Sequence, residues 1–220
     1  MTAKTKITTA KILFLVVVIL HFIGLFYNDL LAFVSKPLLM TALVFVYLVS
    51  VQKANFWYVS ALFFSFWGDV LLLFNNQYFI LGLGSFLITQ LLYIKLIISL
   101  IKRVTLSKIT IVSLPFLFYF LSFLHLILDK VIDIKLPVIV YGFVLSLFGI
   151  LSFLYYLQQK TTASLWLFLG AILFILSDSI IALNQFYNTK IDAQIYIMLT
   201  YILAQYLICK SFFSQTSFQK

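Results

Sequence analysis

Apolar runs of about 20 residues alternate with short polar breaks along the whole chain. A helix needs about 20 apolar residues to cross the ~30 Å hydrocarbon core of a bilayer. The runs show no alternation of period two, and backbone polar groups in lipid have to be bonded internally, so the runs predict helices and not barrel strands. The expected spans are 11–27, 35–51, 56–75, 78–100, 108–128, 137–157, 163–183 and 194–213.

The composition supports this interpretation. Of 220 residues, 64% are hydrophobic and 10% are charged, whereas a soluble domain is about 25% charged. We therefore predict an all-α polytopic membrane protein, a bundle of eight transmembrane helices in one membrane-embedded domain over residues 1–220. Lysines precede the first run as in a signal peptide, but no small-residue cleavage site follows Phe26, so the first helix is expected to be retained.

What the chain lacks disfavours several functions. The net charge is +9, but the basic residues are spread over the polar breaks, so nucleic-acid binding is not expected. Cys209 is the single cysteine, and His21 and His125 have no partner at metal-ligand spacing. No phosphate loop, nucleophile elbow or zinc motif is present. We therefore expect no metal and no cofactor, and we interpret both histidines as packed or interfacial residues.

Lysine and arginine residues are unevenly divided between the two sides of the predicted bundle. Alternate breaks place 11 of the 15 on the side of the two termini and 4 on the other side. By the positive-inside rule both termini face the cytoplasm, and we expect a multi-pass protein of a bacterial cytoplasmic membrane, with membrane lipids as its surroundings. Four of the six acidic residues fall on the outer breaks: Asp29, Asp129, Asp133 and Asp192.

The other two acidic residues, Asp69 and Asp178, lie inside the apolar spans 56–75 and 163–183. A charged side chain near the centre of a transmembrane helix costs about 2.5–3.5 kcal/mol on the insertion scale. Both spans are expected to run outward, and each aspartate lies beyond the midpoint, so the two share a depth in the outer half. We therefore predict a facing functional pair. In the alternative reading each carboxyl group only fixes helix packing, a task that Ser, Asn or Gln could perform without the cost of ionisation.

The surroundings of the two aspartates are similar, which suggests that spans one to four and five to eight form a degenerate parallel repeat. The matching pairs, at spacings of six and five residues, are Asp69 with Asn75, Asp178 with Asn184, Gln90 with Lys95, and Gln205 with Lys210.

Further polar residues lie within the spans. Tyr201 and Gln205 lie near the middle of the last span, four residues apart, and are predicted to line a polar interior. Lys36 opens the second span with Pro37. Its ammonium group either extends to the outer interface or binds an anion, and the sequence leaves both readings open.

Taken together, these motifs resemble the YhhN-type lysoplasmalogenase family of eight-span membrane proteins, along nearly the whole chain. Members often carry His where this chain has Gln90, which argues against carrying a proton-transfer role over to that helix. The segments that carry the resemblance are Lys36-Pro37-Leu38, Ser65 to Asp69, Gly82 to Tyr93, Pro137-Val138 with Tyr141, Gly170 to Phe174, Ser177-Asp178-Ser179, Ala182-Leu183-Asn184, Thr200-Tyr201 and Ala204-Gln205.

The resemblance implies hydrolysis of the vinyl ether bond of a lysophospholipid taken from the bilayer, with release of a fatty aldehyde and a glycerophospho-amine. The reaction needs one acid and one carboxylate, a demand that glycosidases meet with two carboxyl groups. Asp69 and Asp178 are the predicted catalytic residues, because burial and mutual repulsion can divide these roles between two carboxyl groups. The predicted substrate-binding residues are Lys36, Gln90, Tyr141, Asn184, Tyr201 and Gln205.

Two other functions are compatible with the same residues. Intramembrane carboxylates also act as proton relays, so a small proton-coupled transporter is the main alternative. The spans that carry the aspartates contain no interior proline, unlike the broken helices common near transporter sites. A scaffold or lipid-binding protein without turnover is the third reading.

Overall fold

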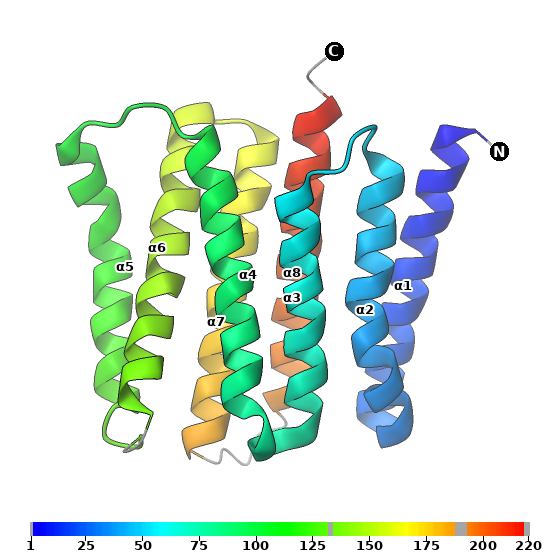
Figure 1. The fold of residues 1–220 in the computed structure, drawn as a ribbon, viewed down its shortest axis with the longest axis horizontal. Helices are drawn as coiled ribbons and strands as arrows, with labels where there is room; N and C mark the ends of the chain where they lie inside the picture. Colours follow the sequence, from blue (N-terminus) through cyan, green and yellow to red (C-terminus); the bar gives the residue numbers. More distant parts are fainter. Residues whose placement is uncertain (1, 132–133, 188–192, 218–220) are drawn as a thin grey trace. The chain divides into compact units, whose positions relative to one another are not determined.

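The computed structural model describes residues 2–131, 134–187 and 193–217, and this part of the chain is all-helical. Eight of its helices are long and apolar enough to cross a membrane, which confirms the predicted fold class. The helices are α1 (Ala3–Tyr27), α2 (Asp29–Ser50), α3 (Phe56–Leu71), the 3₁₀-helix η1 (Leu72–Gln77), α4 (Phe79–Leu100), α5 (Leu106–Ile127), α6 (Lys135–Gln159), α7 (Thr162–Tyr187) and α8 (Ala193–Ser217) (Figure 1).

The first polar break is much shorter than the sequence predicts. Helix α1 begins at Ala3, eight residues before the expected start, and α2 begins at Asp29, six residues early. Asn28 alone separates them: its N–H donates to Gly24, and its side chain accepts the N–H of Leu31 at 3.0 Å. Asparagine is a strong N-cap because its side chain satisfies an amide that the helix leaves unpaired.

Two further expectations about helix ends are corrected. Lys36 and Pro37 do not open the second helix but lie inside α2, which starts at Asp29. The third span is not one α-helix to residue 75, because α3 ends at Leu71 and continues as η1. Tighter 3₁₀ turns are common at helix C-termini, and here the change comes two residues after Asp69.

The chain forms two compact units. The first contains residues 1–93 and 212–220, and the second contains residues 94–211. In the first unit α1 runs antiparallel along α2, α2 packs on α3, and α3 is joined to α4 by the Thr89 hydroxyl, which donates to the Ala61 carbonyl at 3.1 Å. In the second unit α6 packs against both α5 and α7, and the Ser177 hydroxyl on α7 donates to the Ile197 carbonyl on α8 at 3.1 Å.

The two segments that match in sequence differ in backbone. Asp178 and Asn184 lie on one continuous α-helix, α7, whereas the chain changes from α3 to η1 between Asp69 and Asn75. The four-helix repeat and the single domain over 1–220 therefore stay predictions.

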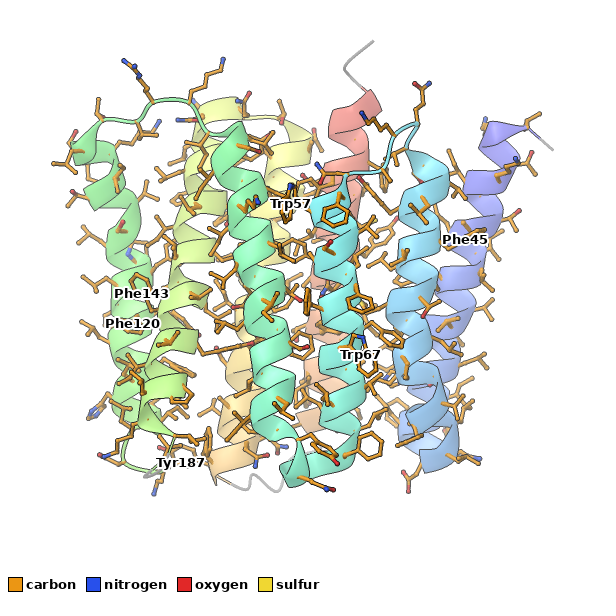
Figure 2. All side chains as sticks on the ribbon, viewed as in Figure 1. Phe45, Trp57, Trp67, Phe120, Phe143 and Tyr187 are labelled. Carbon is orange, nitrogen blue, oxygen red and sulfur yellow. The ribbon has the colours of Figure 1, made fainter. Side chains whose placement is uncertain are left out.

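Large apolar side chains cover the outward surface of the helices (Figure 2). Phe45 on α2, Trp67 on α3 and Phe143 on α6 are each more than two-fifths exposed. Soluble monomers rarely expose contiguous apolar surface on this scale, whereas a bilayer solvates it. The exposed residues thus agree with a multi-pass membrane protein.

Candidate active site

All predicted site residues other than Asn184, which is half-buried, are enclosed within the protein. Each of these seven side chains is at most 7% exposed: Lys36, Asp69, Gln90, Tyr141, Asp178, Tyr201 and Gln205. The snorkelling alternative for Lys36 is therefore wrong, since its side chain is covered by protein. Asp69 belongs to the first unit and Asp178 to the second. That Asp69 and Asp178 face each other therefore stays a prediction.

In the first unit, α1, α2 and α3 bring four polar side chains into one buried group, here called the Lys36 cluster: His21, Ser35, Lys36 and Asp69. The Lys36 ammonium interacts electrostatically with both the Asp69 carboxyl group and the His21 ring. Burying a charge is costly unless an opposite charge or hydrogen bonds compensate. The Lys36 cluster thus combines one cation, one carboxyl group and one imidazole in a protein-enclosed space.

The hydrogen bonds of Ser35 determine which nitrogen of His21 carries a proton. The Ser35 hydroxyl donates its single hydrogen to the Leu31 carbonyl at 2.6 Å, with Ala32 as a second acceptor at 3.2 Å. Its contact with His21 Nδ1, at 2.9 Å, must then be one in which Ser35 accepts and the Nδ1–H donates. In a neutral ring Nε2 is therefore an acceptor.

His21 Nε2 is buried and has no hydrogen-bond partner in the described part of the chain, while the His21 residue as a whole is 1% exposed. A buried acceptor left without a donor costs about 1–3 kcal/mol. Such a group in a native protein calls for an explanation, and a ligand that supplies an N–H or O–H provides one.

The Lys36 cluster lies below one end of the first unit. His21 is six residues before the end of α1, and Lys36 is seven residues after the start of α2, so both lie about 10 Å inside the helix ends. Two α-helical residues and η1 follow Asp69, which places it about 15 Å inside. His21 and Lys36 thus lie closer to the helix ends than Asp69 does.

Close approach of α1 and α2 holds His21 against Ser35. A Cβ atom added to Gly24 would lie 2.4 Å from the Ala32 nitrogen, so only glycine permits this spacing. Gly24 is three residues after His21, and Ala32 is three residues before Ser35, so both pairs share the same helix faces.

Replacing Gly24 with alanine should destabilise the protein and loosen this contact. The new methyl group meets backbone, which cannot move aside as a flexible side chain can, and overpacking of this kind costs about 1–3 kcal/mol. Thermal unfolding of the purified protein measures the effect. Gly84→Ala is the matched control, because a Cβ atom at Gly84 meets nothing within 4 Å. Equal melting temperatures for the two variants would contradict the prediction.

In the second unit, Tyr141 on α6 donates its hydroxyl hydrogen to Asp178 Oδ2 on α7 at 2.5 Å. A hydroxyl can donate to Oδ2 whether the carboxyl group is ionised or carries its proton on the other oxygen. Both predicted site residues are thus in direct contact, and the phenol fixes the orientation of the carboxyl group.

The residues on either side of Asp178 bond to different helices. Ser177 donates to the Ile197 carbonyl on α8, and Tyr119 on α5 bonds to Ser179 at 2.9 Å. Successive residues of a helix point about 100° apart, so three consecutive polar residues reach three neighbours. The segment Ser177-Asp178-Ser179 therefore locks the rotation of α7 and with it the direction of the Asp178 side chain.

The remaining predicted residues line the interiors of the two units. In the first unit, Gln90 follows Thr89, whose hydroxyl accepts from Ser65 at 3.3 Å. In the second unit, Tyr201 on α8 packs edge-on against Phe174 on α7, with ring centroids 5.9 Å apart. Gln205, one turn further along α8, is fully buried. Both side chains are buried, and their place in a polar interior facing the aspartates stays a prediction.

Sequence reasoning missed His21, which it interpreted as a packed histidine. The signal was present: His21 and Ser35 are each seven residues from Asn28, so a turn at Asn28 brings them opposite each other. Tyr119, paired with Ser179, was missed as well. His125, by contrast, is exposed near the end of α5. In the described residues, no group of three or more His, Cys, Asp or Glu side chains could hold a metal ion.

Comparison with known proteins gives one result that bears on identity. No curated protein and no solved structure matches the chain significantly. The sequence model of the YhhN family matches residues 31–212, from the first turn of α2 to the last turns of α8. The match includes both intramembrane aspartates and every predicted site residue, and it leaves out α1 with His21. The chain therefore belongs to the YhhN family.

Proposed function

We propose that this protein is an intramembrane hydrolase that cleaves the vinyl ether bond of lysoplasmalogen-type lipids. Membership of the YhhN family supports a lysoplasmalogenase-type function at the level of the family. The observation that carries the proposal for this chain is the Lys36 cluster, a buried cation, carboxyl group and imidazole acceptor near one end of the first unit.

The reaction requires one proton donor, one carboxylate and one water molecule. Protonation of the vinyl carbon that is not bound to oxygen gives an oxocarbenium-like cation. Water then adds to the carbon that is bound to oxygen, and a proton of this water passes to a carboxylate. The resulting hemiacetal breaks its carbon–oxygen bond to the glycerol, giving a fatty aldehyde and an alcohol. Asp69 and Asp178 supply the two carboxyl groups in this proposal, as in hydrolases that stabilise a similar cation.

Charge complementarity suggests how the roles are divided. Asp69 interacts with the Lys36 ammonium, so we assign it the carboxylate that stabilises the cation and receives the proton from water. Asp178 is then the acid, with Tyr141 on Oδ2 orienting its other oxygen toward the vinyl carbon. If Asp69 were instead the acid and Asp178 the carboxylate, the pH dependence of kcat in the two single variants would show it.

The Lys36 cluster matches the chemical groups of a lysolipid. Phosphate, free hydroxyl and vinyl ether occupy the three consecutive carbons of its glycerol. In the proposal the Lys36 ammonium binds the phosphate, His21 Nε2 accepts the hydroxyl hydrogen, and Asp69 faces the vinyl ether. The hydroxyl is the group that separates a lysolipid from a two-chain lipid, so His21 would recognise the substrate class.

Aldehyde release from a lysoplasmalogen by the purified, full-length protein tests the proposal. We expect fatty aldehyde and glycerophospho-amine in equal amounts, and no release from a lysolipid with a saturated ether bond, which cannot be protonated on carbon. Absence of aldehyde, together with proton-coupled flux in liposomes, would support the transporter reading instead.

Replacing Lys36 with methionine should raise KM by about tenfold or more and change kcat little. A hydrogen bond to a charged group contributes about 1.5–3 kcal/mol, and the phosphate is bound equally in ground and transition states. Steady-state aldehyde kinetics measure both constants. Lys53→Met, at an exposed lysine between α2 and α3, is the control. A fall in kcat with unchanged KM would show that Lys36 serves only the Asp69 carboxylate.

Replacing His21 with leucine should remove the preference for a free hydroxyl. The wild-type protein should favour the lysolipid over its 2-deoxy analogue by about fivefold in kcat/KM, since one neutral hydrogen bond contributes about 1 kcal/mol. The variant should use both at similar rates, whereas His125→Leu, at the exposed histidine, should keep the preference. If His21→Leu kept the full preference for the lysolipid over the 2-deoxy analogue, His21 would not be the residue that recognises the hydroxyl.

A further inference from the structure

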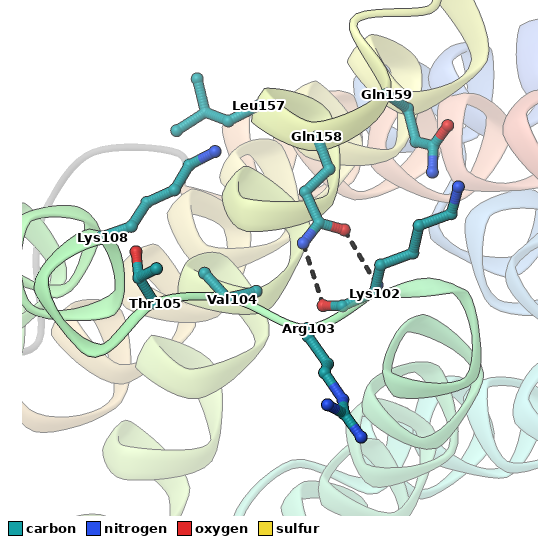
Figure 3. Close-up of a pocket in the computed structure, with 8 residues that line it drawn as sticks. All are labelled: Lys102, Arg103, Val104, Thr105, Lys108, Leu157, Gln158 and Gln159. Carbon is teal, nitrogen blue, oxygen red and sulfur yellow. Dashed lines mark hydrogen bonds between the residues drawn. The ribbon is translucent and has the colours of Figure 1, made fainter.

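A basic pocket lies in the second unit, and neither aspartate is among its lining residues. It is formed where α4 ends, α5 begins and α6 ends, and its volume is about 480 Å³ (Figure 3). Its lining residues are Lys102, Arg103, Val104, Thr105, Lys108, Leu157, Gln158 and Gln159. Nothing in the proposed hydrolysis uses them.

The pocket is held in shape by a side-chain clamp. The Gln158 amide at the end of α6 accepts the Lys102 N–H and donates to the Lys102 carbonyl, both at 3.0 Å (Figure 3). These two bonds satisfy both backbone groups of Lys102 in the α4–α5 connection. The cationic residues therefore extend from a fixed loop and not from a loosely held one.

No acidic residue of the pocket lining balances its positive charge. Three cations line it, Lys160 follows directly after Gln159, and no acidic residue is among the lining residues. Asp129 lies beyond the opposite end of α5, which is about 33 Å long, and Asp178 lies about 24 Å along α7 from its start. The cationic lining therefore suits an anion supplied from outside the protein.

The location favours an anion that is part of a lipid. The pocket lies at the ends of three apolar helices, where the membrane–water interface is expected, on the side that the distribution of Lys and Arg predicts to be cytoplasmic. Exposed apolar side chains follow along α5 from the end of the helix that forms the pocket. They include Ile111, Leu114 and Phe118. Acyl chains can lie along this surface while the headgroup phosphate occupies the pocket.

We infer that the pocket formed by the α4–α5 connection and the end of α6 binds the phosphate headgroup of an anionic membrane phospholipid. Basic pockets between transmembrane helices on the cytoplasmic side are suited to such headgroups, because each Lys or Arg near the surface attracts anionic lipid. The lining residues include none of the proposed hydrolytic residues, and the test of this inference does not depend on activity.

Native mass spectrometry of the full-length protein in neutral detergent, titrated with cardiolipin, phosphatidylcholine or inorganic phosphate, tests the inference. Cardiolipin should bind at least tenfold more tightly than phosphatidylcholine. Combined Lys102→Gln, Arg103→Gln and Lys108→Gln substitutions should weaken cardiolipin binding about 10²-fold, at about fivefold per cation. Inorganic phosphate at millimolar concentration should not displace cardiolipin. If inorganic phosphate displaced cardiolipin and bound as tightly, the lipid assignment would be overturned.

A charge-matched control separates a built site from general surface charge. Lys4, Lys6 and Lys11 on α1 are replaced together by glutamine, with the same change in net charge, and cardiolipin binding should change less than about threefold. A loss equal to that of the pocket variant would overturn the inference. Gln158→Leu keeps all charges but removes the clamp, and it should weaken cardiolipin binding about tenfold. Unchanged binding in this variant would contradict a preformed pocket, and unchanged thermal unfolding confirms that each variant is folded.

Discussion

Asp69→Asn and Asp178→Asn should each lower kcat by about 10²–10⁴-fold while the protein still inserts and folds. Asparagine preserves the shape of aspartate and can still form hydrogen bonds, so a packing role survives the change. It cannot deliver a proton at neutral pH or stabilise a cation by charge. Aldehyde release in single-turnover conditions measures the chemical step directly.

Two comparisons make this result decisive. Asp129→Asn changes the same charge at an exposed residue outside the helices and should leave kcat within about twofold of wild type. The double variant should lose much less than the product of the two single losses, since residues that act as one catalytic unit are non-additive. A loss below about tenfold at either aspartate, or fully multiplicative losses, would refute shared acid–base chemistry.

Tyr141→Phe should lower kcat by about 10–10²-fold and leave the helix packing almost unchanged. The substitution removes the hydroxyl that donates to Asp178 Oδ2 and keeps the ring. This hydrogen bond orients the proposed acid, and a small misplacement of a catalytic group can lower the rate by up to about 10²-fold. Because the effect lies in the chemical step, KM should stay within a factor of about two.

Tyr155→Phe is the matched control for this experiment. Tyr155 is buried on the same helix, nearly four turns further along α6, so the change again removes one hydroxyl from a buried ring. Its kcat should equal that of the wild type. If both variants lost activity equally, the loss would reflect general disturbance of α6, and the positioning role of Tyr141 would fail.

The helices were predictable because their signal is local. Runs of about 20 apolar residues have to be helical in lipid whatever they pack against, and the breaks between them are short. Helix ends were less predictable where a single residue makes the turn. Asn28 caps α2 and ends α1, so residues 29–34, which lie between the first two expected spans, are helical. Pro37 likewise suggested a helix start but lies inside α2.

The amino-acid sequence by itself determined that the chain spans the membrane with helices and that Asp69 and Asp178 are unusual within them, because the cost of a charge in lipid depends on residue type and depth. Tertiary structure alone decided that Lys36 is buried with Asp69 and that Tyr141 contacts Asp178. Helices that are apolar all round carry no stripe to mark the face that turns inward. Their rotation and spacing are settled by contacts between helices, as where Gly24 admits the Ala32 backbone and thereby brings His21 to Ser35.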